Sequence, residues 1–328
     1  MSITIFFSTM NLPCIFALIK RFCIYMRLVF MRLICLLIFC LLFDVSFAQK
    51  RPILAFTSDT QQPMTIEKIF LRSDHNEKAT KMIFEDIAAL KPAGMFILGD
   101  VVSVGYKNKK WKAVDKYIAD LKKDSIPVYA TLGNHEVMFI ASKGIKQFKT
   151  RFPMFKPEGY MEVIDSVAVV LLNSNFDKMK SVEIKAQDTW YTETLKKLDA
   201  DPAIRAVIVG CHHSPYTNST IVKPSMQVQL KFVPEFIASK KAQLFLTGHS
   251  HNFERFKVND KDFLVIGGGG GLHQPLNSTY ITPDIEPKYK PAFHYLQVSR
   301  EGSKLNILSR QLRYDFSGFA DGITFNIQ

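Results

Sequence analysis

Cysteine is almost absent from this sequence beyond its first 48 residues. Four of the five cysteines lie in that stretch, and only Cys211 follows it. A chain with a single thiol cannot form an internal disulfide, so it cannot belong to the class of small disulfide-stabilised domains. Packing of an apolar core must stabilise the folded part of the chain.

Internal repeats, low-complexity tracts and obvious linkers are also lacking. Charged residues make up 22% of the 328 residues, whereas hydrophobic residues make up 47%. This balance excludes an intrinsically disordered chain and a membrane protein with many spans. The length predicts one large globular domain or two small ones, with enough apolar residues for a substantial core.

One apolar run near the N-terminus has the features of a signal peptide. It begins at Met31, with Arg32 as its basic residue and 33–43 as its apolar part. A transmembrane helix needs about 20 apolar residues, so a cleaved signal is favoured over an uncleaved anchor. We expect cleavage after Ala48, a mature chain of residues 49–328 and an exported protein, periplasmic or secreted. Residues 1–30 are expected to result from an upstream start.

Basic residues exceed acidic ones, and the formal net charge is +12. Residues 1–48 hold four basic residues and one acid, so the predicted mature chain has a net charge of +9. A positive chain favours anionic substrates or surfaces. The lysines are scattered along helix-like segments, so specific nucleic-acid binding is not predicted, and neither is stable insertion into a membrane.

Short apolar segments alternate with longer amphipathic ones along the chain. Their unbroken apolarity predicts strands that are buried on both faces. The predicted strands are 53–57, 94–98, 127–131, 167–172, 206–210, 242–246, 262–267, 293–298 and 304–309. The predicted helices are 64–71, 76–90, 110–123, 142–150, 187–199 and 229–240. This order predicts an α/β domain in which helices cover two packed sheets.

Polar side chains that can bind metals follow five of these predicted strands. The five segments are 58–61, 99–100, 133–136, 211–215 and 247–251. They contain five of the eight histidines: His135, His212, His213, His249 and His251. Because the carboxyl ends of parallel strands meet at one edge of a sheet, we expect a single crevice lined by Asp, Asn and His.

The spacing within these segments suits a metal centre. In extended chain, residues i and i+2 point to the same side, so His249 and His251 can reach adjacent ions. Asp59 and Gln61 have the same spacing. A mixture of carboxylate, amide and imidazole ligands favours Fe, Mn or Zn over Ca²⁺.

These five blocks, in this order, resemble the calcineurin-like metallophosphoesterases. The pattern of that family is D-x-H, G-D-x-x-D, G-N-H-[DE], H and G-H-x-H, and the resemblance spans residues 53 to about 300. The segments 248–255 (GHSHNFER) and 213–216 (HSPY) are similar to the purple acid phosphatase branch. The resemblance implies a four-layer αββα sandwich of two mixed sheets flanked by helices.

The resemblance also implies roles for single residues in a centre of two divalent or trivalent metal ions. Asp100 would bridge both ions, and Asp59 and His251 would bind the first. The second ion would be bound by Asn134, His249 and His213, with His212 as the alternative to His213. His135 is similar to the histidine that lies beside the scissile phosphate without binding metal.

The sequence departs from the family pattern at two positions. Gln61 replaces the histidine of D-x-H and would offer its carbonyl oxygen to the first ion. Ser103 replaces the second Asp of G-D-x-x-D, where the purple branch has an iron-binding tyrosine. We therefore predict that the iron-loaded protein is colourless. Glu254 and Arg255 are expected to form a structural ion pair.

These features together predict a hydrolase of small phosphorylated substrates. The first choice is an acid phosphatase-like phosphomonoesterase, in which metal-activated hydroxide attacks phosphorus. A phosphodiesterase with the same centre is one alternative, and the loops 216–228 and 272–291 would decide between the two. The other alternative is a secreted binding or scaffold protein with a degenerate first metal site, which Gln61 and Ser103 keep open.

Overall fold

The computed structural model describes residues 12–46, 51–71, 75–277 and 282–328. The chain divides into two units, Met1–Arg51 and Pro52–Gln328. In the first unit, helix α1 (Leu12–Ser46) contains the predicted apolar part of the signal. The predicted cleavage site after Ala48 and the segment 1–11 lie outside the described residues. Among the helices that the structure does describe, none has the length and hydropathy that crossing a membrane requires.

One sheet of the second unit contains both ends of that unit's chain. Its three parallel strands are β1 (Ile53–Thr57), β2 (Gly94–Ile97) and β3 (Val128–Ala130). Three antiparallel strands, β10 (His294–Glu301), β11 (Lys304–Leu312) and β12 (Phe319–Ile327), continue the sheet from β1, so that the order is β12-β11-β10-β1-β2-β3. The carboxyl ends of β1, β2 and β3 consequently lie at the same edge.

The other sheet has four parallel strands in its middle. These are β5 (Val167–Leu171), β6 (Ala206–Gly210), β7 (Ala242–Thr247) and β9 (Lys261–Ile266). Two antiparallel strands, β4 (Tyr160–Ile164) and β8 (Phe253–Val258), form its edges in the order β4-β5-β6-β7-β9-β8. Both sheets are mixed, as the resemblance implies.

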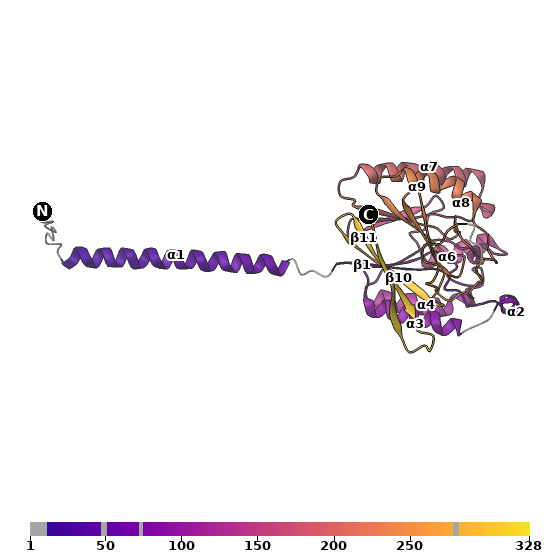
Figure 1. Cartoon of the computed structure of the whole chain (residues 1–328), viewed down its shortest axis with the longest axis horizontal. Coiled ribbons are helices and arrows are strands. Elements are labelled where there is room, and N and C mark those ends of the chain that lie inside the picture. Colours follow the sequence, from indigo (N-terminus) through magenta and orange to yellow (C-terminus); the bar gives the residue numbers. More distant parts are fainter. Residues whose placement is uncertain (1–11, 47–50, 72–74, 278–281) are drawn as a thin grey trace. The chain divides into compact units, whose positions relative to one another are not determined.

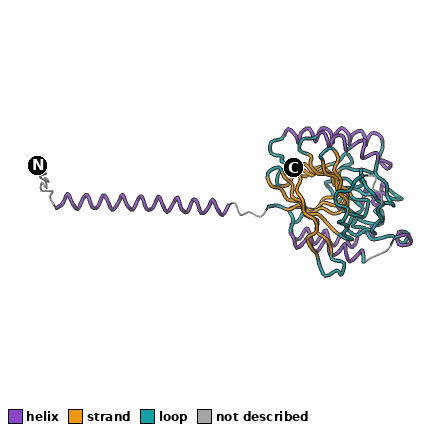
Figure 2. The backbone as a smooth tube through the Cα atoms, viewed as in Figure 1, coloured by secondary structure: helices purple, strands orange, loops and turns teal. Residues whose placement is uncertain are grey.

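Helices cover the outer faces of the two sheets. Figure 1 shows α7 (Ser181–Ala200), α8 (Met226–Lys231) and α9 (Val233–Ala238) on one side of the strands. It shows α3 (Asn76–Leu90) and α4 (Asn108–Lys123) on the other side. Figure 2 shows the strands gathered between these two sets of helices. The predicted four-layer αββα sandwich is therefore confirmed.

The short helices α2 (Glu67–Phe70), α5 (Asn134–Val137) and α6 (Ala141–Arg151) occupy connections between the strands, as does the 3₁₀ turn Phe176–Lys178. The predicted helix 229–240 is wrong as a single element. It is divided at Phe232 into α8 and α9, because Pro234 lies in the first turn of α9 and cannot continue a preceding helix. Proline is well tolerated in that first turn.

Two apolar clusters hold the layers together. The larger includes side chains from both sheets and from α3 and α4, among them Phe56, Phe96 and Leu246. The smaller lies between the second sheet and α7, α8 and α9, and includes Phe232, Phe245 and Cys211. Cys211 is fully buried. No disulfide stabilises this unit as described, so apolar packing carries its stability, as the shortage of cysteine predicts.

Candidate metal centre

The predicted ligands lie in loops at the carboxyl ends of parallel strands. Asp59 follows β1, Asp100 follows β2 and Asn134 begins α5 after β3. His212 and His213 follow β6, and His249 follows β7. Backbone hydrogen bonds join these loops: Asp59 N–H donates to Gly99 O (3.1 Å), and Gly248 N–H donates to His212 O (3.0 Å). These bonds join neighbouring loops within each sheet, and the His249 N–H, which donates to Asp59 Oδ2 at 3.0 Å, joins a loop of one sheet to a loop of the other.

Several ligand positions need glycine beside them because the loops approach very closely. A Cβ atom on Gly133 would lie 2.1 Å from Asp100 Oδ1, and one on Gly248 would lie 2.2 Å from Asp59 Oδ2. A Cβ on Gly271 would lie 2.5 Å from the His251 ring. These contacts explain the glycines of the motifs. They also explain why the glycine run 267–271 packs against the site.

Asp100 lies at the middle of the cluster. One of its oxygens, Oδ1, accepts a hydrogen bond from the His135 backbone N–H at 2.8 Å. The other, Oδ2, lies 3.3 Å from His212 Nε2 and 3.7 Å from His135 Nε2. Burial opposes a charge on Asp100, but His212 and His135 outweigh burial and lower its pKa well below the usual range. Asp100 is therefore a carboxylate, as a bridging ligand must be.

His212 points a ring nitrogen at two oxygen ligands. Its Nδ1–H donates to Leu98 O at 2.9 Å, so Nε2 faces Asp100 Oδ2 and lies 3.0 Å from Asn134 Oδ1. Burial lowers the pKa of His212, but the nearby carboxylate of Asp100 raises it to about 9. A positive charge is therefore favoured between these oxygens, and a cation bound there would supply it in place of the proton.

Asp59, Gln61 and His251 form the other side of the cluster. His251 Nδ1–H donates to Leu272 O at 2.7 Å, and its Nε2 lies 3.3 Å from Asp59 Oδ1. The Gln61 amide nitrogen fits as donor to the carbonyl oxygens of Asp59 (3.1 Å) and Asp100 (3.0 Å). The amide oxygen then faces His251 Nε2 at 3.3 Å. In this orientation Gln61 directs its carbonyl oxygen into the site.

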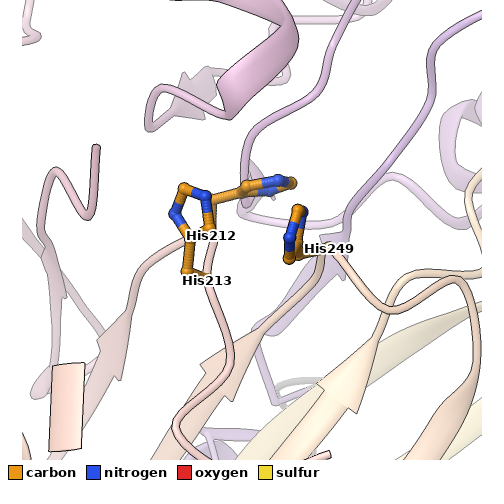
Figure 3. Close-up of side chains that lie close together, drawn as sticks. All are labelled: His212, His213 and His249. Atoms are coloured by element: carbon orange, nitrogen blue, oxygen red, sulfur yellow. The ribbon is translucent and has the colours of Figure 1, made fainter. Parts of the chain in front are cut away.

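Three imidazoles face one another across the loops after β6 and β7 (Figure 3). The ring centroids of His213 and His249 are 4.6 Å apart, and each lies 5.0 Å from that of His212. Burial and the charge of His212 lower the pKa of His213 to about 3. Burial and the other two imidazoles lower the pKa of His249 well below its usual value. Both rings are therefore neutral, which is the state that binds metals.

The donor set fits two cations that share the middle of the cluster. Ligand atoms of His212, His213 and His249 lie within 4.8 Å of one another, and so do those of Asp59, Asp100 and His212. Sequence analysis preferred His213 to His212; the structure brings both to the site, and His212 alone contacts both Asp100 and Asn134. Oxygen and imidazole donors suit Fe, Mn or Zn.

His135 stands beside this cluster and is only 6% exposed. Its Nδ1–H donates to Ser103 O at 2.9 Å, which leaves Nε2 directed away from the backbone. Nε2 lies 3.6 Å from Glu67 Oε1. Burial lowers the pKa of His135, but Asp100, the Ser103 carbonyl and Glu67 together raise it. Sequence analysis did not identify Glu67, because it belongs to no motif and lies 68 positions before its partner.

Glu136 is a fully buried carboxylate that joins two of the ligand loops. It accepts hydrogen bonds from the backbone N–H groups of Asp100 (2.9 Å), Val102 (3.1 Å) and Gly133 (2.8 Å). Burial and the charge of Asp100 raise its pKa to about 7, against the effect of these donors. Glu136 therefore fixes the backbone that carries Asp100 and Asn134.

The expected ion pair between Glu254 and Arg255 is wrong. They are neighbours on strand β8, so their side chains point to opposite faces. Glu254 accepts hydrogen bonds from Thr217 Oγ1 (2.6 Å), Asn218 N–H (2.7 Å) and Ser250 Oγ (3.1 Å). Arg255 instead pairs with Asp262 and Glu286. Glu254 thus attaches the loop after residue 216 to the loop that carries His249.

A cleft of about 410 Å³ opens over the cluster. Its lining includes Asp100, Asn134, His135, His249 and His251. The cluster is therefore accessible to a small molecule even though its ligands are mostly buried. A volume of this size is typical of binding sites for small organic molecules.

The family model described as calcineurin-like phosphoesterase matches residues 53–253. No curated protein matches the sequence. The chain is similar in structure to the purple acid phosphatase PPD1 from yellow lupin seeds, with 16% identity and a TM-score of 0.60 over 84% of this chain and 53% of the lupin chain. It therefore spans about half the length of the lupin protein.

Two further solved structures share the fold. GAP50, the anchor in the inner membrane complex of Plasmodium, has 16% identity and a TM-score of 0.60 over 85% of this chain and 89% of its own. A dimetal phosphatase from Danio rerio has 11% identity and a TM-score of 0.51 over 82% of this chain and 98% of its own. At these identities the likeness establishes the fold and nothing finer.

Proposed function

Because this chain belongs to the calcineurin-like phosphoesterase family, we propose that it is a metal-dependent hydrolase of small phosphate esters, with phosphomonoesters as its main substrates. The observation that supports this most is the convergence of Asp59, Asp100 and His212 within 4.8 Å of one another beneath an open cleft. Carboxylate and imidazole donors at that distance form a site that can hold cations beside a bound phosphate.

Each residue of the cluster has a defined part in this proposal. Asp59, Gln61 and His251 would hold one ion, and Asn134, His212 and His249 would hold the other, with Asp100 available to both. His213 stays within reach of the second ion, while its Nδ1 contacts Ser174 Oγ at 2.8 Å. Metal content separates the two histidines: His212→Ala should lose about one equivalent of metal, whereas His213→Ala should retain it. The opposite result would assign the ligand to His213.

Two such ions, when bound, neutralise charge on the phosphoryl oxygens and activate water for attack on phosphorus. His135 acts from the side of the cleft. Its Nδ1–H bond to Ser103 O fixes the ring, and Nε2 donates a hydrogen bond to a phosphoryl oxygen or gives a proton to the leaving oxygen. Because burial and hydrogen bonds set these positions before substrate arrives, little reorganisation accompanies the reaction.

The test is an assay of aryl phosphate monoesters and diesters with Mn²⁺, Zn²⁺ and Fe, from acid to alkaline pH, alongside the metal content of the protein. About two equivalents of metal with faster monoester hydrolysis supports the proposal. Faster diester hydrolysis would make the protein a phosphodiesterase with the same centre.

A binding or scaffold function is the second candidate, and two observations favour it. Gln61 stands where the family pattern has histidine, and the buried Ser103 Oγ has no hydrogen-bond partner among the described residues. Both departures from the family pattern lie on the side of the first metal ion, so that site is expected to bind its ion more weakly than the second. One equivalent of metal or less, with no hydrolysis under any of these ions, would establish this candidate instead of the enzyme.

We also propose that the protein is exported after removal of a signal peptide, so that the mature chain comprises residues 49–328. The support is the sequence pattern around Met31 and the buried single Cys211, which leaves no exposed thiol in the mature chain as described. Sequencing the N-terminus of the protein purified from its natural source should give Gln49 as the first residue. A retained Met1 or Met31 would contradict cleavage.

A further inference from the structure

Beyond the cluster, the cleft is built from apolar side chains. Its floor is the predicted metal centre with His135, whereas Ile66 and Leu71 line one part of its walls, and Ile221 and Val222 line another. Ile66 is 56% exposed and Ile221 is 52% exposed. Exposed isoleucines beside a polar site are unfavourable in water, and contact with an apolar group of a ligand would remove that cost.

The part of the wall that contains Ile221 and Val222 is a fixed loop. Both backbone N–H groups donate to Ser219 Oγ, at 3.1 and 3.3 Å. Ser219 Oγ in turn donates to Gln274 Oε1 at 2.7 Å, and Ser219 forms a β-bridge with Leu276. The two apolar side chains therefore have a defined place above the cluster before any ligand arrives.

Buried Glu254 ties the same loop to the metal centre. It accepts hydrogen bonds from Thr217 and Asn218 on one side and from Ser250, between His249 and His251, on the other. Because Glu254 is fully buried, these bonds are not replaced by water. The apolar wall and the predicted ligands therefore keep one geometry.

The part of the lining that contains Ile66 is a single helical turn whose ends are joined by hydrogen bonds. Glu67 Oε2 accepts a hydrogen bond from Met64 N–H at 2.5 Å, and the Leu71 N–H donates to Glu67 O at 2.9 Å. This turn presents Ile66 to the cleft. The Glu67 side chain also lines the cleft, so a negative charge lies beside the apolar surface.

Cations and free polar groups are scarce in this lining. None of the described residues that line the cleft is Lys or Arg, although the chain as a whole is strongly basic. Gln274, a polar residue of the lining, has both ends of its amide occupied: Nε2 donates to His249 O, and Oε1 accepts from Ser219. A leaving group with its own phosphates or many hydroxyl groups would therefore find few partners here.

We propose that the cleft selects phosphate esters whose leaving alcohol is apolar, alkyl or aryl, and that Ile66, Ile221 and Val222 bind that group. This inference rests on the proposed function and adds the substrate class. The phosphate lies over the metal centre, where its charge is matched, and the hydrocarbon part contacts the isoleucine and valine side chains. Selectivity then follows the apolar area buried by the leaving group.

The experiment uses the metal-loaded full chain and a series of n-alkyl phosphates from two to eight carbons. The leaving alcohols have nearly the same acidity, so a trend in kcat/KM reports contact with the cleft and not chemistry. We expect kcat/KM to rise about two- to fourfold per methylene until the cleft is filled. Glycerol phosphate should react more slowly than propyl phosphate, and phenyl and naphthyl phosphates show whether aryl groups bind equally.

Ile66→Ser and Ile221→Ser should flatten this series, because each removes apolar surface that the longer chains would contact, so kcat/KM should fall most for the longest esters. Leu230→Ser is the matched control: Leu230 is 71% exposed on α8 and outside the cleft lining, so the series should be unaffected. Two results would overturn this inference and leave the proposed function intact. One is hydrolysis of all esters with a kcat/KM that does not depend on chain length. The other is a rise in kcat/KM per methylene that is the same in both isoleucine variants as in the wild type. No hydrolysis of any ester would overturn the proposed function.

Discussion

Three of the predicted ligands have backbone conformations that most residues avoid. The φ angles of Asp59, Asp100 and His249 are 59°, 48° and 66°, in the left-handed region. Such a conformation costs about 1–3 kcal/mol for a residue other than glycine and persists only where the surroundings enforce it. Here the His249 N–H donates to both Asp59 oxygens, and the Gln61 N–H donates to Asp100 O. The hydrogen bonds of the folded protein thus hold these ligands in conformations that they would not adopt alone.

Glu136 accepts a hydrogen bond from the Asp100 N–H and so helps to enforce the conformation of Asp100, which replacement of Glu136 tests. Glu136→Gln leaves one acceptor oxygen for three backbone N–H groups and places an NH₂ group against at least one of them. We expect the free energy of unfolding to fall by about 1–3 kcal/mol in urea denaturation of the metal-free protein. The control is Glu193→Gln on the exposed surface of α7, which should change it by less than about 0.5 kcal/mol. Equal stabilities of the two variants would contradict the assigned role.

Replacing His135 tests catalysis separately from metal binding, because His135 is not a predicted metal ligand. In His135→Ala the predicted ligands remain, so metal content should stay at the wild-type value while kcat falls about 10²–10⁴-fold. Metal analysis and aryl phosphate turnover on the same sample check both parts. Unchanged turnover would remove His135 from the mechanism, and lost metal would make it a structural part of the centre.

Ser103 bears on the spectrum of the protein. It lies where the purple branch has its iron-binding tyrosine, and a serine hydroxyl cannot produce that visible absorption. We expect the protein loaded with ferric iron to show no strong band in the visible range. A strong band would mean that another phenolate reaches the iron.

At the level of helices and strands, the sequence predicted the interior of the fold better than its edges. All nine predicted strands exist, because the parallel strands are short, mostly apolar runs and because β10 and β11 keep several buried apolar residues. β4, β8 and β12 were missed. β4 and β12 are edge strands with alternating or mostly partial burial, so their apolar pattern is weak. β8 begins inside the GHSHNFER motif, where its residues were read as part of the site.

The sequence predicted those residues of the candidate site that belong to recognisable motifs. The pattern of a strand followed by a polar loop predicted that Asp59, Asp100, Asn134 and the histidines of the later loops lie at one edge, where the structure places them. Contacts between distant segments were not predictable, because no local pattern encodes them. Glu67 beside His135 is one case, and the Glu254 bonds to the loop after residue 216 are another.

The closeness of these loops gives a prediction at the same scale. A Cβ on Gly248 would lie 1.9 Å from Ser58 Oγ and 2.2 Å from Asp59 Oδ2, so Gly248→Ala must push the loop after β7 away from the loop after β1. We expect metal affinity to fall at least about tenfold in competition with a chelating dye. In the control, Gly302→Ala, the added methyl meets nothing within 4 Å, so affinity should not change despite some loss of stability at φ +63°.

For the molecule as a whole, the buried His294 sets a limit on stability in acid. In the part of the chain that the structure describes, neither ring nitrogen has a hydrogen-bond partner, and burial lowers the pKa of His294 to about 3. The unfolded chain binds a proton near pH 6.5, whereas the folded protein does not until about pH 3. The contribution of His294 to the free energy of unfolding is therefore fully present above pH 6.5. It falls between pH 6.5 and pH 3, by up to about 1.4 kcal/mol per pH unit.

Urea denaturation between pH 7 and pH 4, in the presence of a chelator, measures this effect. His294→Leu removes the titrating group without losing a hydrogen bond. The slope of its free energy of unfolding against pH should therefore correspond to uptake of about one proton fewer on unfolding than in the wild type. The exposed His75, changed to Asn, is the control and should keep the wild-type slope. Identical slopes for wild type and His294→Leu would show that His294 gains a proton inside the folded state.

The burial of Cys211 has a practical consequence for following the cleft in solution. A chain that begins at Gln49 has this one sulfhydryl, fully enclosed beneath the second sheet, where burial raises its pKa. Maleimide dyes and nitroxide labels react with exposed thiolates and would leave it unmodified. A cysteine introduced at Ile69, outside the cleft lining on α2, would then carry the sole fluorophore or spin label and report on that turn as substrate enters.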